Sequence, residues 1–174
     1  MRERHHSSEI ERRYADMRAT AQKRYPDVDG LSLELFFYLF HSVNRIQARI
    51  AEISQAFDLT LPGFNVLGLL SHGPREGMPL NELSRFLLVS RANVTGLIDS
   101  LARKGLVKRA HHETDRRVRL ARITKKGEMV LESYRPHHFK KAREIAGTLT
   151  VDEKKTLVRI LSKWNAGLGS PQEE

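Results

Sequence analysis

The sequence predicts a mainly helical α+β fold in which helices surround one small β-hairpin. Over most of the chain, apolar residues recur at intervals of three and four, which is the period of an amphipathic helix. Residues 106–123 instead hold two short β-prone runs separated by a polar turn. A chain of 174 residues is long enough for one hydrophobic core with helical additions.

The first part of the chain is predicted to contain two helices. Residues 9–24 are highly charged, contain no glycine or proline, and end before Tyr25-Pro26, where helical geometry is disfavoured. Apolar residues then recur from Leu31 to Phe57, which predicts one amphipathic helix. At ~40 Å it is longer than a core of this size covers. Part of its apolar stripe is therefore expected to meet another chain.

A buried helix and a turn are predicted next. Pro62 suits the first position of a helix, and Gly73-Pro74 stops it. Its apolar residues predict deep burial: Phe64, Val66, Leu67, Leu69 and Leu70. The following residues, 73–79, contain two glycines and two prolines, which indicates a turn leading into a short strand near Met78.

Two helices joined by a tight turn are predicted after that strand. Apolar residues at 80, 83 and 87 mark a short helix, and Ser90 is the expected N-cap of a second one. The second helix runs to Lys104 with an apolar face of Val94, Leu97, Ile98 and Leu101. Gly105 then stands where a helix end needs a positive φ.

The rest of the chain is predicted to form the hairpin and two more helices. Strands are expected at 106–109 and 118–123, with a polar turn at 111–117. Thr124 is the expected N-cap of a helix that passes residue 144 and is kinked at Pro136. Thr150 and Glu153 form a capping box for the last helix, whose apolar face is Leu157, Ile160, Leu161 and Trp164.

The positive charge is concentrated in one segment. The whole chain carries a net charge of +9, while residues 103–126 alone hold ten Lys and Arg against two acids. Such a cluster is typical of a surface that binds a polyanion, above all nucleic acid.

The predicted helix-turn-helix suggests how DNA is read. The major groove accepts one α-helix, and the preceding helix braces it. With the apolar face of residues 90–104 packed inward, Arg91, Asn93 and Thr95 project outward near its start. Arginine can pair with guanine and asparagine with adenine through two hydrogen bonds each. Arg116 and Arg117, beside Asp115 at the hairpin tip, suit the narrow minor groove.

These residues carry a family resemblance. The motifs Leu80-Asn-Glu-Leu-Ser, Val89-Ser-Arg-Ala-Asn-Val-Thr-Gly-Leu-Ile-Asp-Ser-Leu-Ala-Arg-Lys-Gly-Leu-Val, Asp115-Arg-Arg and Ile123-Thr-Lys-Lys-Gly resemble the MarR family of bacterial regulators, with an extra N-terminal helix. The resemblance implies a winged helix-turn-helix with a two-stranded wing. The DNA-binding residues are predicted to be Ser90, Arg91, Asn93, Thr95, Arg103, Arg116, Arg117 and Arg119.

The resemblance also implies a division of the chain and a set of partners. Residues 31–60 and 132–168 would form a helical dimerisation region, residues 61–131 the DNA-binding domain, residues 1–30 an extension and residues 169–174 a frayed tail. The expected partners are double-stranded DNA at a palindromic operator, a second copy of the chain, and a small effector of the phenolic or aromatic acid class, held between the two regions.

The sequence offers candidate residues for an effector site but none for a metal site. His41 and Arg45 lie one helical turn apart and can clamp an anion, although a polar pair satisfied at a dimer interface is the favoured explanation. Phe64 is the third candidate effector-binding residue. Adjacent histidines such as His137 and His138 point about 100° apart on a helix, so no metal site is expected.

Composition narrows the function classes. With no cysteine, disulfides, thiolate metal sites and cysteine nucleophiles are excluded.

No apolar run reaches the roughly 20 residues that span a bilayer, and the charged N-terminus does not resemble a secretory signal. A cytoplasmic protein without membrane contact is therefore expected. No hydrolase or phosphate-loop motif is present, and neither enzyme activity nor a cofactor is predicted. The sequence therefore predicts a ligand-responsive repressor, and the alternative is a sequence-independent architectural DNA-binding protein.

Overall fold

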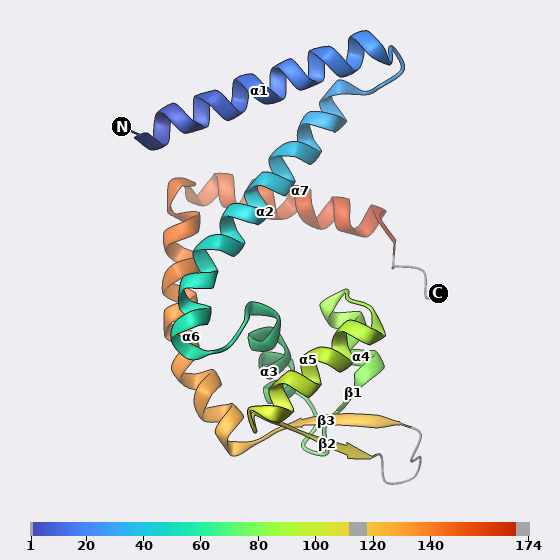
Figure 1. The fold of residues 1–174 in the computed structure, drawn as a ribbon, viewed down its shortest axis with the longest axis vertical. Helices are drawn as coiled ribbons and strands as arrows, with labels where there is room; N and C mark the ends of the chain where they lie inside the picture. The colour runs from blue at the N-terminus through green and yellow to red at the C-terminus, as the bar shows by residue number, and fades with distance from the viewer. Residues whose placement is uncertain (1, 112–117, 170–174) are drawn as a thin grey trace. The chain divides into compact units, whose positions relative to one another are not determined.

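The fold is mainly helical, with one small antiparallel sheet (Figure 1). The structure is a computed structural model that describes residues 2–111 and 118–169, with side chains from residue 9 onward. The chain separates into two units between Ala48 and Arg49, and each unit is described by itself.

The first unit is a helical hairpin. Helix α1 (Arg2–Arg24) packs on the first part of α2 (Gly30–Phe57). The Tyr14 ring stacks on Phe37 at 5.2 Å between centroids, and Arg18 forms an ion pair with Glu34. The end of α1 and the length of α2 are as predicted, but α1 begins seven residues earlier than expected.

The second unit holds the hydrophobic core. Helix α3 (Leu61–His72) is capped by Thr60, whose side chain accepts a hydrogen bond from the Gly63 amide. Pro62 is the second residue of the helix, one position later than predicted. Four of its five predicted core residues are buried, and the fifth, Leu69, is only partly buried. The end of α2 contributes Ile53 to the same core.

The helix-turn-helix consists of α4 (Leu80–Leu87) and α5 (Arg91–Arg103). The Ser90 side chain caps α5 by accepting a hydrogen bond from the Asn93 amide at 3.2 Å. Leu88 makes the sharp turn between the helices with φ 53°, and Gly105 ends the motif with φ 71°. Both helices lie where they were predicted, and the predicted N-cap Ser90 and positive-φ Gly105 of α5 are confirmed.

The sheet has three strands in the order β1-β3-β2. Strands β2 (Val107–His111) and β3 (Arg119–Ile123) form the predicted hairpin, although β2 extends two residues further than expected. The short β1 (Met78–Pro79) pairs with β3, so β3 is the central strand. Both edges of β3 are therefore paired with other strands, and its adjacent residues Leu120 and Ala121 are both buried.

Two helices complete the second unit. Helix α6 (Lys125–Ile145) is capped by Thr124 and contains Pro136, and a short 3₁₀ turn, η1 (Ala146–Thr148), follows it. Helix α7 (Val151–Gly167) begins with the predicted capping box of Thr150 and Glu153. Within the described part of the chain, no helix is both long and apolar enough to cross a membrane.

Candidate DNA-binding surface

Helix α5 has one face in the core and one face in solvent. Val94 and Ile98 are fully buried, and Leu101 is 4% exposed. Arg91 and Asn93 are exposed on the first turn. Packing of the apolar face against the core fixes the rotation of α5 about its axis. Arg91 and Asn93 therefore point away from the core.

Thr95 differs from its two neighbours. It is only partly exposed, and its hydroxyl donates a hydrogen bond of 2.9 Å to the Arg91 carbonyl. The hydroxyl proton is therefore occupied by the helix, which leaves the oxygen as an acceptor and the methyl group for apolar contact.

A groove of about 290 Å³ runs between the start of α5 and the hairpin. Its lining brings together Arg91, Thr95 and Arg119, three of the predicted DNA-binding residues, with Asn81 from the first turn of α4. Sequence reasoning missed Asn81, although a polar residue in the bracing helix of a helix-turn-helix is a signal for it. Two guanidinium groups and an amide thus share one concave surface.

Arg103 lies apart from this group. It is exposed in the last turn of α5, twelve residues beyond Arg91, which corresponds to ~18 Å along the helix axis. Beside it, Lys104 is held by Asp58, with 2.7 Å between the Lys104 ammonium and the carboxylate. The structure therefore does not group Arg103 with the residues at the start of the helix.

The base of the hairpin is fixed to α5. Arg109 of β2 forms an ion pair with Asp99, and Ala121 of β3 is fully buried beside β1 and β2. Arg116 and Arg117 at the predicted hairpin tip lie outside the described residues. Their contact with DNA remains a prediction.

The three predicted effector residues belong to different units. His41 and Arg45 lie on α2 in the first unit, where the His41 ring is 6.2 Å from that of Tyr14. Phe64 lies in the second unit and packs on Tyr134 and His138, with ring centroids 4.6 and 4.5 Å away. The two units are not placed relative to each other, so a site formed by all three stays a prediction.

The cluster around Phe64 contains two polar atoms without a partner among the described residues. Tyr134 is completely buried, and neither its hydroxyl nor Nδ1 of His138 makes a hydrogen bond. Burial lowers the pKa of His138 below its ordinary value, so this imidazole is neutral at neutral pH. Buried polar groups are normally hydrogen-bonded, which makes this cluster a candidate binding site that the sequence indicated only through Phe64.

Metal binding finds no support in the described ranges 2–111 and 118–169. No group of three or more His, Asp or Glu side chains there is arranged to hold a metal ion. The described features instead are a groove at the start of an outward-facing helix, beside a β-hairpin, lined by apolar side chains together with Arg91 and Arg119. They define a winged helix-turn-helix protein with a surface suited to DNA.

Comparison with known proteins gives the family. The MarR family profile matches residues 57–118. The chain is 32% identical to the HTH-type transcriptional repressor YetL of Bacillus subtilis over 137 residues, which are 79% of this chain and 82% of YetL. The chain belongs to the MarR family of DNA-binding transcriptional regulators.

Solved structures show the same fold. The MarR family regulator Sco3205 of Streptomyces coelicolor, solved in complex with DNA, matches with a TM-score of 0.73 and 21% identity, over 77% of this chain and 85% of Sco3205. BpsR of Bordetella bronchiseptica, whose DNA binding is regulated by 6-hydroxynicotinic acid, matches with a TM-score of 0.69 and 24% identity, over 76% of this chain and 98% of BpsR.

Proposed function

We propose that the protein is a cytoplasmic, homodimeric repressor that binds a palindromic operator and releases it when a small effector binds. In this proposal residues 61–131 bind DNA, residues 31–60 and 132–168 form the dimerisation region, residues 1–30 are an extension and residues 169–174 a tail. The relative YetL is named a repressor, which supports the direction of regulation.

The observation that carries the proposal is the grouping of Arg91, Thr95 and Arg119 in one groove at the start of α5. In this arrangement α5 enters the major groove, Ser90 fixes its start, and Arg91 and Asn93 contact base edges. Arg119 and the hairpin-tip residues Arg116 and Arg117 follow the backbone into the minor groove. At the other end of α5, Arg103 contacts a phosphate.

Dimerisation is supported by apolar side chains that each unit leaves in solvent. In the first unit, α2 exposes Leu31, Leu35, Phe40, Val43 and Ile46 by 40% or more. In the second unit, α7 buries no residue and exposes Leu157, Val158 and Ile160 by 45% or more. Large apolar side chains exposed together on one helix are typical of interaction surfaces. A second copy of the chain covers them in the proposed dimer, which places two α5 helices one DNA turn apart.

An aromatic acid is the proposed class of effector. Phe64 and Tyr134 are buried against each other, so in this proposal the two rings part to admit the effector. The Tyr134 hydroxyl and His138 Nδ1 then offer hydrogen bonds to its hydroxyl or carboxylate. His41 and Arg45 are the proposed anion-binding pair from α2. That a neighbour in fold responds to 6-hydroxynicotinic acid supports this class.

In vitro transcription tests the proposal. From a promoter carrying a duplex that the protein binds, adding the protein should lower transcription, and 4-hydroxybenzoate or 6-hydroxynicotinate should restore it. Tyr134→Phe should repress normally but need about five times more effector, because one hydrogen bond of about 1 kcal/mol is lost.

The same variant serves as the folding control. The Tyr134 hydroxyl, which the variant lacks, has no partner in the described structure, so its loss should not destabilise the fold. A rise in transcription on adding protein would make the protein an activator, and effector curves that coincide for both proteins would remove Tyr134 from the site.

A further inference from the structure

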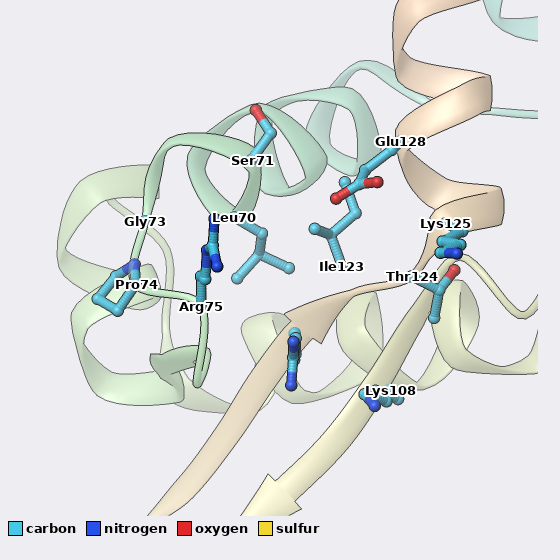
Figure 2. Close-up of a pocket in the computed structure, with 11 residues that line it drawn as sticks. Leu70, Ser71, Gly73, Pro74, Arg75, Lys108, Ile123, Thr124, Lys125 and Glu128 are labelled. Carbon is cyan, nitrogen blue, oxygen red and sulfur yellow. The ribbon is translucent and has the colours of Figure 1, made fainter.

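A second cavity lies beside the hairpin and shares no lining residue with the groove at the start of α5. It has a volume of about 600 Å³ and is lined by residues from the end of α3, the turn before β1, both hairpin strands and the start of α6. Figure 2 shows Arg75 on one side of this cavity, Lys108 and Lys125 on the other, and Glu128 projecting toward the space from α6.

The lining is strongly cationic. Arg75, Lys108, Arg122 and Lys125 contribute four positive charges against the single carboxylate of Glu128. All five side chains are exposed, and none makes a hydrogen bond or ion pair with a described residue. Two cations in and beside the hairpin are by contrast paired, Arg109 with Asp99 and Lys104 with Asp58. Four unpaired cations around one space repel one another, and a bound anion removes that cost.

The strands and the turn fix the backbone positions of three of these cations. Lys108 and Arg122 are directly opposite each other in the β2–β3 register, so they project from the same face of the hairpin. Arg75 lies in the turn from Pro74 to Gly77, whose amide donates to the Pro74 carbonyl at 3.0 Å. Gly77 has φ +111° and touches the Ala121 backbone so closely that a Cβ would lie 2.6 Å from its carbonyl oxygen.

The α6 side of the cavity is equally fixed. The Thr124 hydroxyl donates to the Gly105 carbonyl at 2.7 Å, and Lys126 donates to the Lys104 carbonyl at 2.8 Å. Arg135, further along α6, donates to the Ser71 hydroxyl at the end of α3 at 3.1 Å. These bonds fix the backbone positions of Lys125 and Glu128 beside the hairpin.

We propose that this cavity binds a small oxyanion with two or more negative charges, of the sugar-phosphate or polycarboxylate class. The guanidinium groups of Arg75 and Arg122 suit bidentate contact with phosphate or carboxylate, and the two lysines add charge. Glu128 accepts a hydrogen bond from a ligand hydroxyl, and Leu70 and Ile123 contact its carbon skeleton. A carboxylate and apolar side chains suit a small molecule of this kind better than a DNA backbone.

Calorimetry on the full chain in a phosphate-free buffer tests the site. Glucose 6-phosphate and citrate are the two charged probes, and glucose is the neutral one. We expect one molecule of a charged probe per chain and no binding of glucose. The double variant Arg75→Gln/Arg122→Gln should bind the probe at least tenfold more weakly. The matched double variant Arg159→Gln/Lys163→Gln, which removes two exposed cations of α7, should stay within twofold of the unaltered protein.

The comparison of probes and variants decides the outcome. Binding of glucose 6-phosphate alone assigns a phosphate ligand, and binding of citrate alone assigns a polycarboxylate. The proposal is overturned if neither probe saturates, or if both double variants weaken binding equally. If neither probe binds, a separate DNA titration shows why. A lower salt dependence of DNA binding in Arg75→Gln/Arg122→Gln alone would mean that the cavity faces DNA phosphates. No DNA or effector enters the calorimetry, so its result is independent of the proposed repression.

Discussion

Gly127→Ala is expected to lower the free energy of unfolding by about 3 kcal/mol, the upper end of the usual cost of overpacking. Gly127 is buried in the first turn of α6, and a Cβ there would lie 2.1 Å from the Leu106 carbonyl oxygen and 2.9 Å from the Ile123 side chain. The obstacle is backbone, which cannot rotate away. Urea denaturation followed by circular dichroism, at one fixed protein concentration, measures the change.

Gly68→Ala is the matched control, because it adds the same methyl group to another helix of the same unit. Nothing lies within 4 Å of a Cβ at Gly68. Alanine should therefore raise the free energy of unfolding by about 0.5–1 kcal/mol through its higher helix propensity. If the two variants were equally stable, the close contact between Gly127 and the Leu106 backbone would be contradicted.

Arg91→Ala and Asn93→Ala should each reduce the preference for the bound DNA sequence by roughly 5- to 150-fold, which corresponds to the 1–3 kcal/mol of a bidentate base contact. Both side chains are exposed at the start of α5, and both variants keep the buried face of the helix intact. Fluorescence anisotropy titrations against the preferred duplex and single-mismatch duplexes measure the ratio of affinities.

Arg103→Ala is the control for this experiment, since it removes the same side chain from the far end of the same helix. As a phosphate contact, Arg103 should affect all duplexes alike, so its loss weakens binding without changing the ratio. Loss of sequence preference in Arg103→Ala, with Arg91→Ala unchanged, would reverse the proposed orientation of α5.

Local signals in the sequence predicted much of the fold. The N-caps Ser90, Thr124 and Thr150 each accept the hydrogen bond expected of them, and Gly105 has the expected positive φ. Pro62 and the Gly73-Pro74 stop located α3, and the N-cap Thr124 located α6. Helical periodicity located α2, α4, α5 and α7. It did not locate the start of α1, since residues 2–8 have polar side chains with no apolar period.

Features that depend on distant residues were not predictable. The pairing of β1 with β3, the position of Asn81 in the groove and the meeting of Arg75 with Arg122 all join segments separated by ten to more than forty residues. No local pattern encodes such contacts. Likewise, only the packing of α6 on α3 shows that the Tyr134 hydroxyl and His138 Nδ1 are buried without a hydrogen-bond partner among the described residues.

Selection of bound duplexes from a random pool, combined with the mass of the complex in solution, tests the central claim most directly. If α5 reads DNA in a homodimer, the selected sequences will share an inverted repeat with half-site centres 10–10.5 base pairs, or a multiple of that, apart. Two chains will be found on each duplex. An unenriched pool, or one chain bound to a single unrepeated motif, would contradict the account.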